Sequence, residues 1–152
     1  MPVDPDMCRW VPASIFNYVK NNPNGLVHQF QGDDKLPATT DNFCEWRLTT
    51  PDVTDQTLIE TDEQYVLDCL VSADNSADAY RIQRNVGLVM SMFIDFQIYR
   101  LGANNPPDDQ SLVGCLTRRR QVKSRFFGQI GPKIGVVQTA VYATYCLNYE
   151  QG

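Results

Sequence analysis

The stretch QYVLDCLVSADNSADAYRIQRNVGLVMSMFI, residues 64–94, decides the fold class because it predicts a strand that leads directly into a helix. Gln64–Val71 is rich in aromatic, aliphatic and β-branched residues, which is typical of a central strand. Asp74, Asn75 and Ser76 then supply side chains that cap helices, and Asp78 would lie in a first helical turn, where a carboxylate is favoured. We therefore predict a helix over about residues 77–94.

Apolar spacing fixes which side of this predicted helix is buried. Its core face consists of five residues at spacings of three and four: Ala79, Ile82, Val86, Val89 and Phe93. Its solvent face consists of Arg81, Gln83, Arg84 and Asn85. A single apolar stripe of this kind predicts a helix that packs against one face of a sheet.

Upstream of residue 64 the sequence predicts a helix and two strands. Pro12–Asn21 has one apolar face and predicts a short helix, and residues 26–30 predict a brief strand. Residues 43–49 alternate with period two, which places Cys44, Trp46 and Leu48 on one face of a half-buried strand. Residues 51–62 are acidic and threonine-rich around Leu58-Ile59, so we expect either a long hairpin arm or a loop there.

Downstream of the helix the sequence predicts three more strands. They lie over residues 95–101, within the basic segment 112–127, and over 136–149, the longest β pattern in the chain. In the last strand the odd-numbered residues from Val137 to Tyr149 share one face. The predicted fold class is α+β, a mainly antiparallel sheet with two helices packed on one face, forming a single domain over residues 1–152.

Composition excludes several classes of protein. With 152 residues and 43% hydrophobic content, the chain can bury a core without disulfides or metal. We expect no membrane span, no secretory signal and a reducing cytoplasm, and we interpret Cys44, Cys69 and Cys146 as small buried apolar residues.

No pattern in the sequence predicts catalysis, so we expect that the protein is not an enzyme and needs no cofactor or metal. His28 is the only histidine and has no recognisable nucleophile near it in the sequence. Gly128, Gly131 and Gly135 precede a strand rather than a helix, so they are turn glycines and not a phosphate loop. Paired acids fall in predicted loops as solvated charges, with a carboxylate metal site as the minor alternative: Asp33-Asp34, Asp62-Glu63 and Asp108-Asp109.

Charge is distributed unevenly along the chain. Residues 1–78 contain 14 acids and 4 bases, whereas residues 79–152 contain 4 acids and 9 bases. The densest basic segment supplies the candidate partner interface: Arg118, Arg119, Arg120, Lys123 and Arg125. On a single strand, Arg119, Gln121, Lys123 and Arg125 would share one face as a positive stripe. This stripe could be a charged edge strand that keeps the protein soluble, a contact for an acidic partner, or a phosphate-binding surface.

The order of these elements resembles that of the tail terminator proteins of long-tailed bacteriophages. The resemblance is carried by the segments PASIFNYV (12–19), FCEWRL (43–48), YVLDCLV (65–71) with the helix at 77–94, and VYATYCLNY (141–149). It implies a homo-oligomeric ring, usually of six subunits, that caps the tail tube, ends its polymerisation and gives the head-side connector or stopper protein a docking surface. It also implies assembly in the host cytoplasm and a place in the tail or neck of the virion. The long region 102–132 departs from the simplest pattern of the family.

Two other functions remain open from the sequence. Another head-to-tail or baseplate ring component, such as a head-completion or tube-adaptor protein, would have the same general properties. A nucleic-acid-binding module could instead use the basic stripe, with Tyr99, Phe126 and Phe127 stacking on bases. Net charge of −5 argues against duplex binding, so we expect no sequence-specific nucleic-acid partner.

Overall fold

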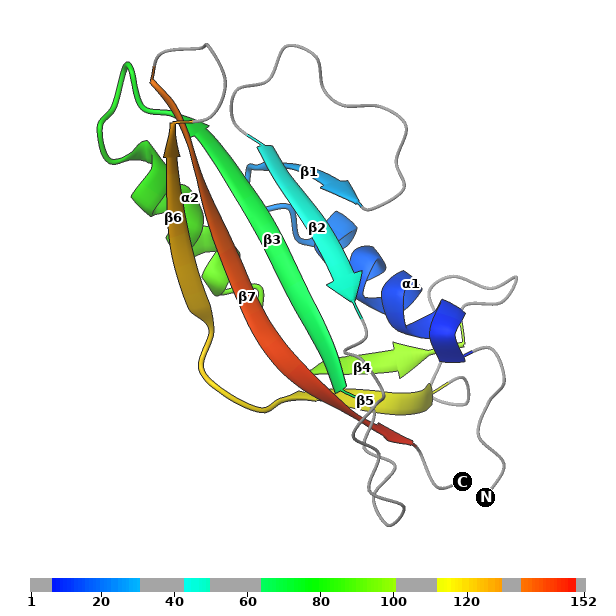
Figure 1. Cartoon of the computed structure of the whole chain (residues 1–152). Helices are drawn as coiled ribbons and strands as arrows, with labels where there is room; N and C mark the ends of the chain where they lie inside the picture. Colours follow the sequence, from blue (N-terminus) through cyan, green and yellow to red (C-terminus); the bar gives the residue numbers. More distant parts are fainter. Residues whose placement is uncertain (1–6, 31–42, 50–63, 101–111, 130–134, 150–152) are drawn as a thin grey trace.

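The computed structural model describes residues 7–30, 43–49, 64–100, 112–129 and 135–149, which form two helices and seven strands (Figure 1). The elements in chain order are α1 (Met7–Asn21), β1 (Val27–Phe30), β2 (Phe43–Thr49), β3 (Gln64–Asp74), α2 (Arg81–Met90), β4 (Phe96–Tyr99), β5 (Leu112–Arg118), β6 (Lys123–Gln129) and β7 (Val136–Tyr149). The predicted α+β class with a mainly antiparallel sheet is confirmed. The sheet makes up more of the structure than predicted, because it has one strand more.

All seven strands belong to one curled sheet that is built around β7. The strand order is β1-β2-β3-β7-β5-β4, and β6 also pairs with β7. All the pairs are antiparallel except β1 with β2. β3 pairs along one side of β7, while β6 and β5 pair with the first and second halves of its other side (Figure 1). β6 and β5 therefore lie end to end along the same side of the longer strand β7.

The core lies on the side of the sheet to which the helices are packed. α2 packs against β3 and β7, and α1 packs against β4 and β1. The strands contribute alternate residues to this core: Cys44 and Trp46 from β2, Tyr65 to Ala73 at odd positions of β3, and Val141 to Leu147 at odd positions of β7. The faces predicted for residues 43–49 and 136–149 are thus confirmed over the described side chains. The other side of the sheet, the open face, has no described helix on it.

Aromatic rings form the centre of the core. The Trp46 and Phe93 rings lie 5.4 Å apart between centroids, and those of Phe96 and Tyr145 lie 5.5 Å apart. The Tyr145 hydroxyl donates a hydrogen bond of 2.8 Å to the carbonyl of Ile94, so its buried oxygen is satisfied.

Helix α2 is shorter than the sequence predicts, spanning 81–90 rather than 77–94. The Asn75 side-chain oxygen accepts a hydrogen bond from the backbone N–H of Ile82, and Asp78 accepts one from Tyr80, so residues 75–80 form a capping turn before the helix. Ala79 is therefore exposed. Phe93 is buried as predicted, but it lies in the turn that follows the helix.

The predicted faces of α2 need one further correction. Asn85, expected in solvent, is 4% exposed, whereas Val86 is only partly buried. Ile82 and Val89 are buried as expected. The buried face of the short helix, formed by Ile82, Asn85 and Val89, is thus rotated from the predicted stripe.

The basic segment forms two strands, so the prediction of one strand within residues 112–127 is wrong. β5 ends at Arg118 and β6 begins at Lys123. Between them, the backbone N–H of Arg119 still donates a hydrogen bond of 2.9 Å to the carbonyl of Thr144, and after this bond the chain turns a corner. At the other end of the chain, α1 begins at Met7 rather than Pro12, with Pro12 inside the helix.

Candidate interaction surface

Among the candidate interface residues, Arg119, Lys123 and Arg125 do not form the one-faced stripe that was predicted for them on a single strand. Arg118 is the last residue of β5, Arg119 and Arg120 lie in the corner between strands, and Lys123 and Arg125 lie on β6. The corner prevents Arg119 from alternating in register with the residues of β6. The structure therefore divides the predicted interface into two groups.

Hydrogen bonds to other parts of the fold hold Arg118 and Arg119, which belong to the first group. The Arg118 guanidinium donates a hydrogen bond of 2.9 Å to the carbonyl of Phe93, and the Arg118 backbone N–H donates one of 2.8 Å to Asp95. The Arg119 guanidinium donates to the sulfur of Cys146 at 3.8 Å. These contacts give Arg118 and Arg119 a structural role at the corner, close to the end of α2.

The second group lies on the open face. In the register of β6 with β7, Lys123 lies opposite Tyr142 and Arg125 lies opposite Ala140, so both bases project on the side away from the helices. The Arg125 guanidinium stacks over the Phe127 ring at 5.4 Å from its centroid. Within the described parts of the chain, neither base has an acidic partner at ion-pair distance.

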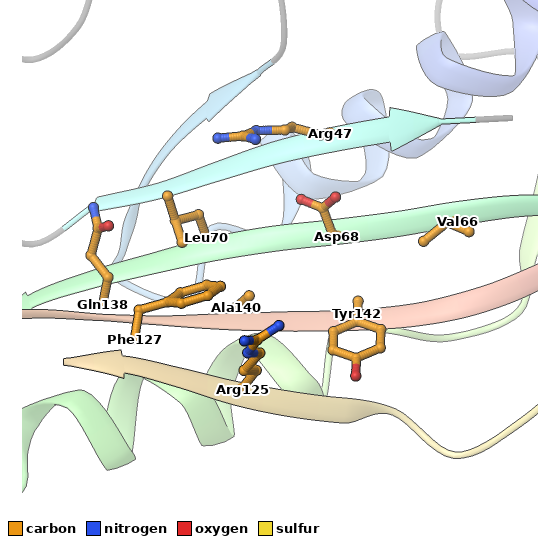
Figure 2. Close-up of a pocket in the computed structure, with 9 residues that line it drawn as sticks. All are labelled: Arg47, Val66, Asp68, Leu70, Arg125, Phe127, Gln138, Ala140 and Tyr142. Atoms are coloured by element: carbon orange, nitrogen blue, oxygen red, sulfur yellow. The ribbon is translucent and has the colours of Figure 1, made fainter. Parts of the chain in front are cut away.

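A depression with a volume of about 510 Å³ crosses the open face between β2 and β6 (Figure 2). Arg47 lies on its β2 side, Arg125 and Phe127 lie on its β6 side, and Ala140 lies between them (Figure 2). The lining residues come from four strands: Arg47, Val66, Asp68, Leu70, Arg125, Phe127, Gln138, Ala140 and Tyr142. We call this depression the open-face groove. Its floor is largely apolar and its two rims carry charges.

The charges at the β2 side of the groove are partly compensated. The Arg47 guanidinium lies 3.4 Å from the carboxylate of Glu45, and Arg47 is also the register partner of Asp68 on β3. Burial raises the pKa of the Asp68 carboxyl, with Arg47 opposing this rise and Glu45 adding to it. Around the groove, the bases that lack an acidic partner among the described residues are therefore on the β6 side, Lys123 and Arg125.

β6 also presents an unusual apolar edge. β6 pairs only with β7 among the described strands, and its Phe126 and Phe127 side chains are 64% and 48% exposed. Phe126 lies opposite Thr139, on the helix side of the sheet, whereas a bulge between Phe126 and Gly128 lets Phe127 line the groove. Unpaired strand edges with exposed apolar side chains favour association with another chain.

Sequence reasoning identified Lys123, Arg125 and the two phenylalanines but missed the β2 and β3 part of this surface. Arg47, Asp68 and Tyr142 occupy the positions that alternate with buried residues, so the period-two pattern contained the signal. Tyr99, which the nucleic-acid interpretation grouped with the phenylalanines, lies on β4 and is not brought to β6. The paired acids at 33–34, 62–63 and 108–109 lie outside the described residues.

His28 has a neighbour that the sequence did not reveal. It is the register partner of Cys44, and the surroundings of the Cys44 thiol, Cys69 first and then His28, lower its pKa against the opposing effect of burial. The imidazole itself bridges two groups, since Trp46 donates to Nδ1 at 2.9 Å and Nε2 lies 2.7 Å from the carbonyl of Pro23. Cys44 is only 1% exposed, so a substrate has no access to the thiol in this conformation. We interpret the cluster as part of the core.

The described residues contain no group of three or more His, Cys, Asp or Glu side chains that could hold a metal ion. None of the described helices is long and apolar enough to cross a membrane.

Comparison with known proteins gives a fold and no family. No protein-family model matches the sequence, and no curated protein does. One of the solved structures that match covers 99% of this chain and 100% of its own length, with a TM-score of 0.63 and 9% sequence identity. The name of that protein describes neither an activity nor a ligand, and at this identity the likeness shows the fold alone.

Proposed function

We propose that this protein is a structural subunit that assembles with copies of itself into a closed ring, and that it acts as a tail terminator of a long-tailed bacteriophage. In this role the ring caps the tail tube, ends its polymerisation and offers a docking surface to the head connector or stopper protein. The protein would be assembled in the host cytoplasm and remain in the tail or neck of the virion. No catalysis, cofactor or metal is needed for these tasks.

The exposed edge of β6 is the observation that carries the self-association part of the proposal. Lys123 and Arg125 place charge on this strand, but Phe126 and Phe127 remain uncovered, and a strand edge with exposed apolar side chains favours pairing with another chain. A neighbouring subunit in the ring would cover this edge. A ring also needs two different complementary patches on each subunit, which agrees with the acidic first half and basic second half of the chain.

The arrangement of layers supports a structural role. With the two helices packed on one face of the sheet, the opposite face is left for partners, and the open-face groove lies there. The order of elements, helix, three strands, helix and closing strands, remains compatible with the resemblance to tail terminators. Another head-to-tail component of the same shape, such as a head-completion or tube-adaptor protein, fits these observations through the same ring-forming surface.

The test compares the oligomeric state of three proteins by light scattering and negative-stain imaging. The first is the wild type, and the second is Phe126→Glu, which places a charge on the β6 edge. The third is the control Tyr80→Glu, which places the same charge at a side chain that is 70% exposed at the start of α2. We expect rings for the wild type and the control and monomers for Phe126→Glu. A wild type that stays monomeric at high concentration would refute the ring, and rings of Phe126→Glu would remove β6 from the interface.

A second candidate function, single-stranded nucleic-acid binding, is favoured by the same strand. Phe127 is exposed beside Arg125 and Lys123, which have no acidic partner among the described residues, and aromatic rings next to basic side chains are the usual platform for stacked nucleotides. A filter-binding assay across salt concentrations separates the two functions. Phosphate-driven binding falls steeply as salt rises, whereas a ring subunit of this kind should retain no oligonucleotide at physiological salt.

A further inference from the structure

We infer that the open-face groove binds the acidic segment 52–63 of a second copy of this chain, an inference that rests on the proposed self-association. The segment has the sequence DVTDQTLIETDE, with five acids, no base and an aliphatic pair, Leu58-Ile59, at its centre. The groove offers the opposite chemistry, a largely apolar floor with Arg125 on its β6 rim and Lys123 next to it on β6, and neither base has an acidic partner among the described residues. Each subunit thus contributes one acidic patch and one basic patch, as a head-to-tail contact requires.

The dimensions of the groove suit a short extended segment. Its floor runs along β3 from Val66 to Leu70, which is roughly 13 Å at about 3.3 Å per residue, the length of about four extended residues. Residues 57–60, with the sequence TLIE, match this length. An aliphatic side chain can then contact the floor near Ala140 while an acid reaches the β6 rim, so apolar burial and charge pairing occur together.

Charge decides where the acids of the segment lie in the groove. Asp68 occupies the floor close to β2, so it repels a carboxylate on that side, and Arg47 is already engaged with Glu45. Lys123 and Arg125 have no acidic partner among the described residues. The acids of the segment therefore belong at the β6 rim. This placement gives Lys123 and Arg125 acidic partners and leaves the Phe127 side chain to contact the apolar residues of the segment.

The strand topology favours binding of the segment in the groove of a neighbouring subunit rather than in the groove of its own subunit. β2 leads the chain out of the sheet at Thr49 and β3 brings it back at Gln64, beyond the Val66 end of the groove. Because β2 leaves the sheet at this end and β3 enters it there, the segment would have to reverse direction to reach the groove of its own subunit. A second copy placed beyond this end of the sheet can receive it directly.

The first arm of the test measures binding of a labelled synthetic peptide, residues 52–63, to the full-length protein by fluorescence anisotropy. We expect saturable binding that is at least tenfold weaker for the groove variant Lys123→Glu with Arg125→Glu. The control variant, Arg81→Glu with Arg84→Glu, makes the same charge change on α2 and should bind the peptide within about twofold of the wild type. Equal affinity of the groove and control variants would overturn the inference.

The second arm tests exchange between subunits. A segment variant, Asp55→Lys with Glu60→Lys, has the complementary charge change to that of the groove variant. Each variant alone should assemble at least tenfold more weakly than the wild type. An equimolar mixture should recover assembly, because every contact between unlike subunits then joins opposite charges. A third variant combines the groove and the segment substitutions in one chain. If it assembles while the mixture does not, the segment lies in its own subunit and the inference is overturned.

The two arms separate failure of this inference from failure of the ring proposal. If the wild type does not assemble, the ring proposal fails, and the peptide arm still tests the groove on the monomer. If the wild type forms rings and the groove variant forms them equally well, the ring stands and the groove does not bind the segment.

Discussion

Replacing Phe93 by alanine tests how the turn after α2 closes the core. The Phe93 side chain is 1% exposed, and its ring lies 5.4 Å from that of Trp46. Loss of a buried ring forfeits about 2 to 3 kcal/mol of transfer free energy, and loss of the aromatic pair about 0.5 to 1.5 kcal/mol more. With the cavity that remains, we expect the free energy of unfolding to fall by about 3 to 5 kcal/mol.

Urea unfolding followed by circular dichroism measures this change. With a slope of about 2 kcal/mol per molar urea, the expected loss lowers the midpoint by about 1.5 to 2.5 M. The control is Phe127→Ala, which removes the same ring from a position that is 48% exposed and should cost less than about 1 kcal/mol. If the midpoint of Phe93→Ala falls no further than that of Phe127→Ala, Phe93 does not belong to the core and the packing described for this turn is wrong.

Three further predictions concern pH, thiol access and a buried hydroxyl. Because burial raises the pKa of Asp68 above 3.8, the folded state loses stability as pH rises through the window just above that value. Asp68→Asn should therefore raise the urea midpoint at pH 7 and leave it unchanged at pH 3. In the folded protein iodoacetamide should label Cys115, which is partly exposed, and spare Cys44, which is buried. Mass spectrometry of the peptides measures the labelling, and label on Cys44 would show that this thiol is an accessible nucleophile. Tyr145→Phe should lower the free energy of unfolding by about 1 to 2 kcal/mol, since it leaves the carbonyl of Ile94 without its donor, and an unchanged melting temperature would contradict this.

Period-two patterns predicted the strands well because one face of each strand is buried. Cys44 and Trp46 on β2, and the odd positions of β7, alternate with polar or half-buried residues, so the sequence itself records which side faces the core. The same alternation could have identified the open-face groove. It did not, because Asp68 and Tyr142 come from separate strands, and only pairing in register with Arg47 and Lys123 brings their side chains together.

Boundaries were predicted less well because they depend on contacts that the local sequence does not contain. The apolar spacing of residues 79–93 continues past both ends of α2, but beyond the helix it matches burial only at Phe93, since Ala79 is exposed. The corner between β5 and β6 contains neither glycine nor proline. The corner forms where the strand paired with β7 changes from β5 to β6. This change is a property of the tertiary structure and not of residues 119–122.

The central place of β7 has a consequence for how the chain folds during synthesis. β3 can pair with β2 early, but its other edge waits for β7, and the register partners Asp74 and Val136 are separated by about 60 residues, which a ribosome adds in roughly 3 to 12 s. Throughout that interval the nascent chain exposes an unpaired strand that is rich in valine and leucine. Because β7 completes the sheet, the closing step waits until residues 136–149 have been made. Removal of β7 should therefore leave an aggregation-prone chain rather than a smaller domain.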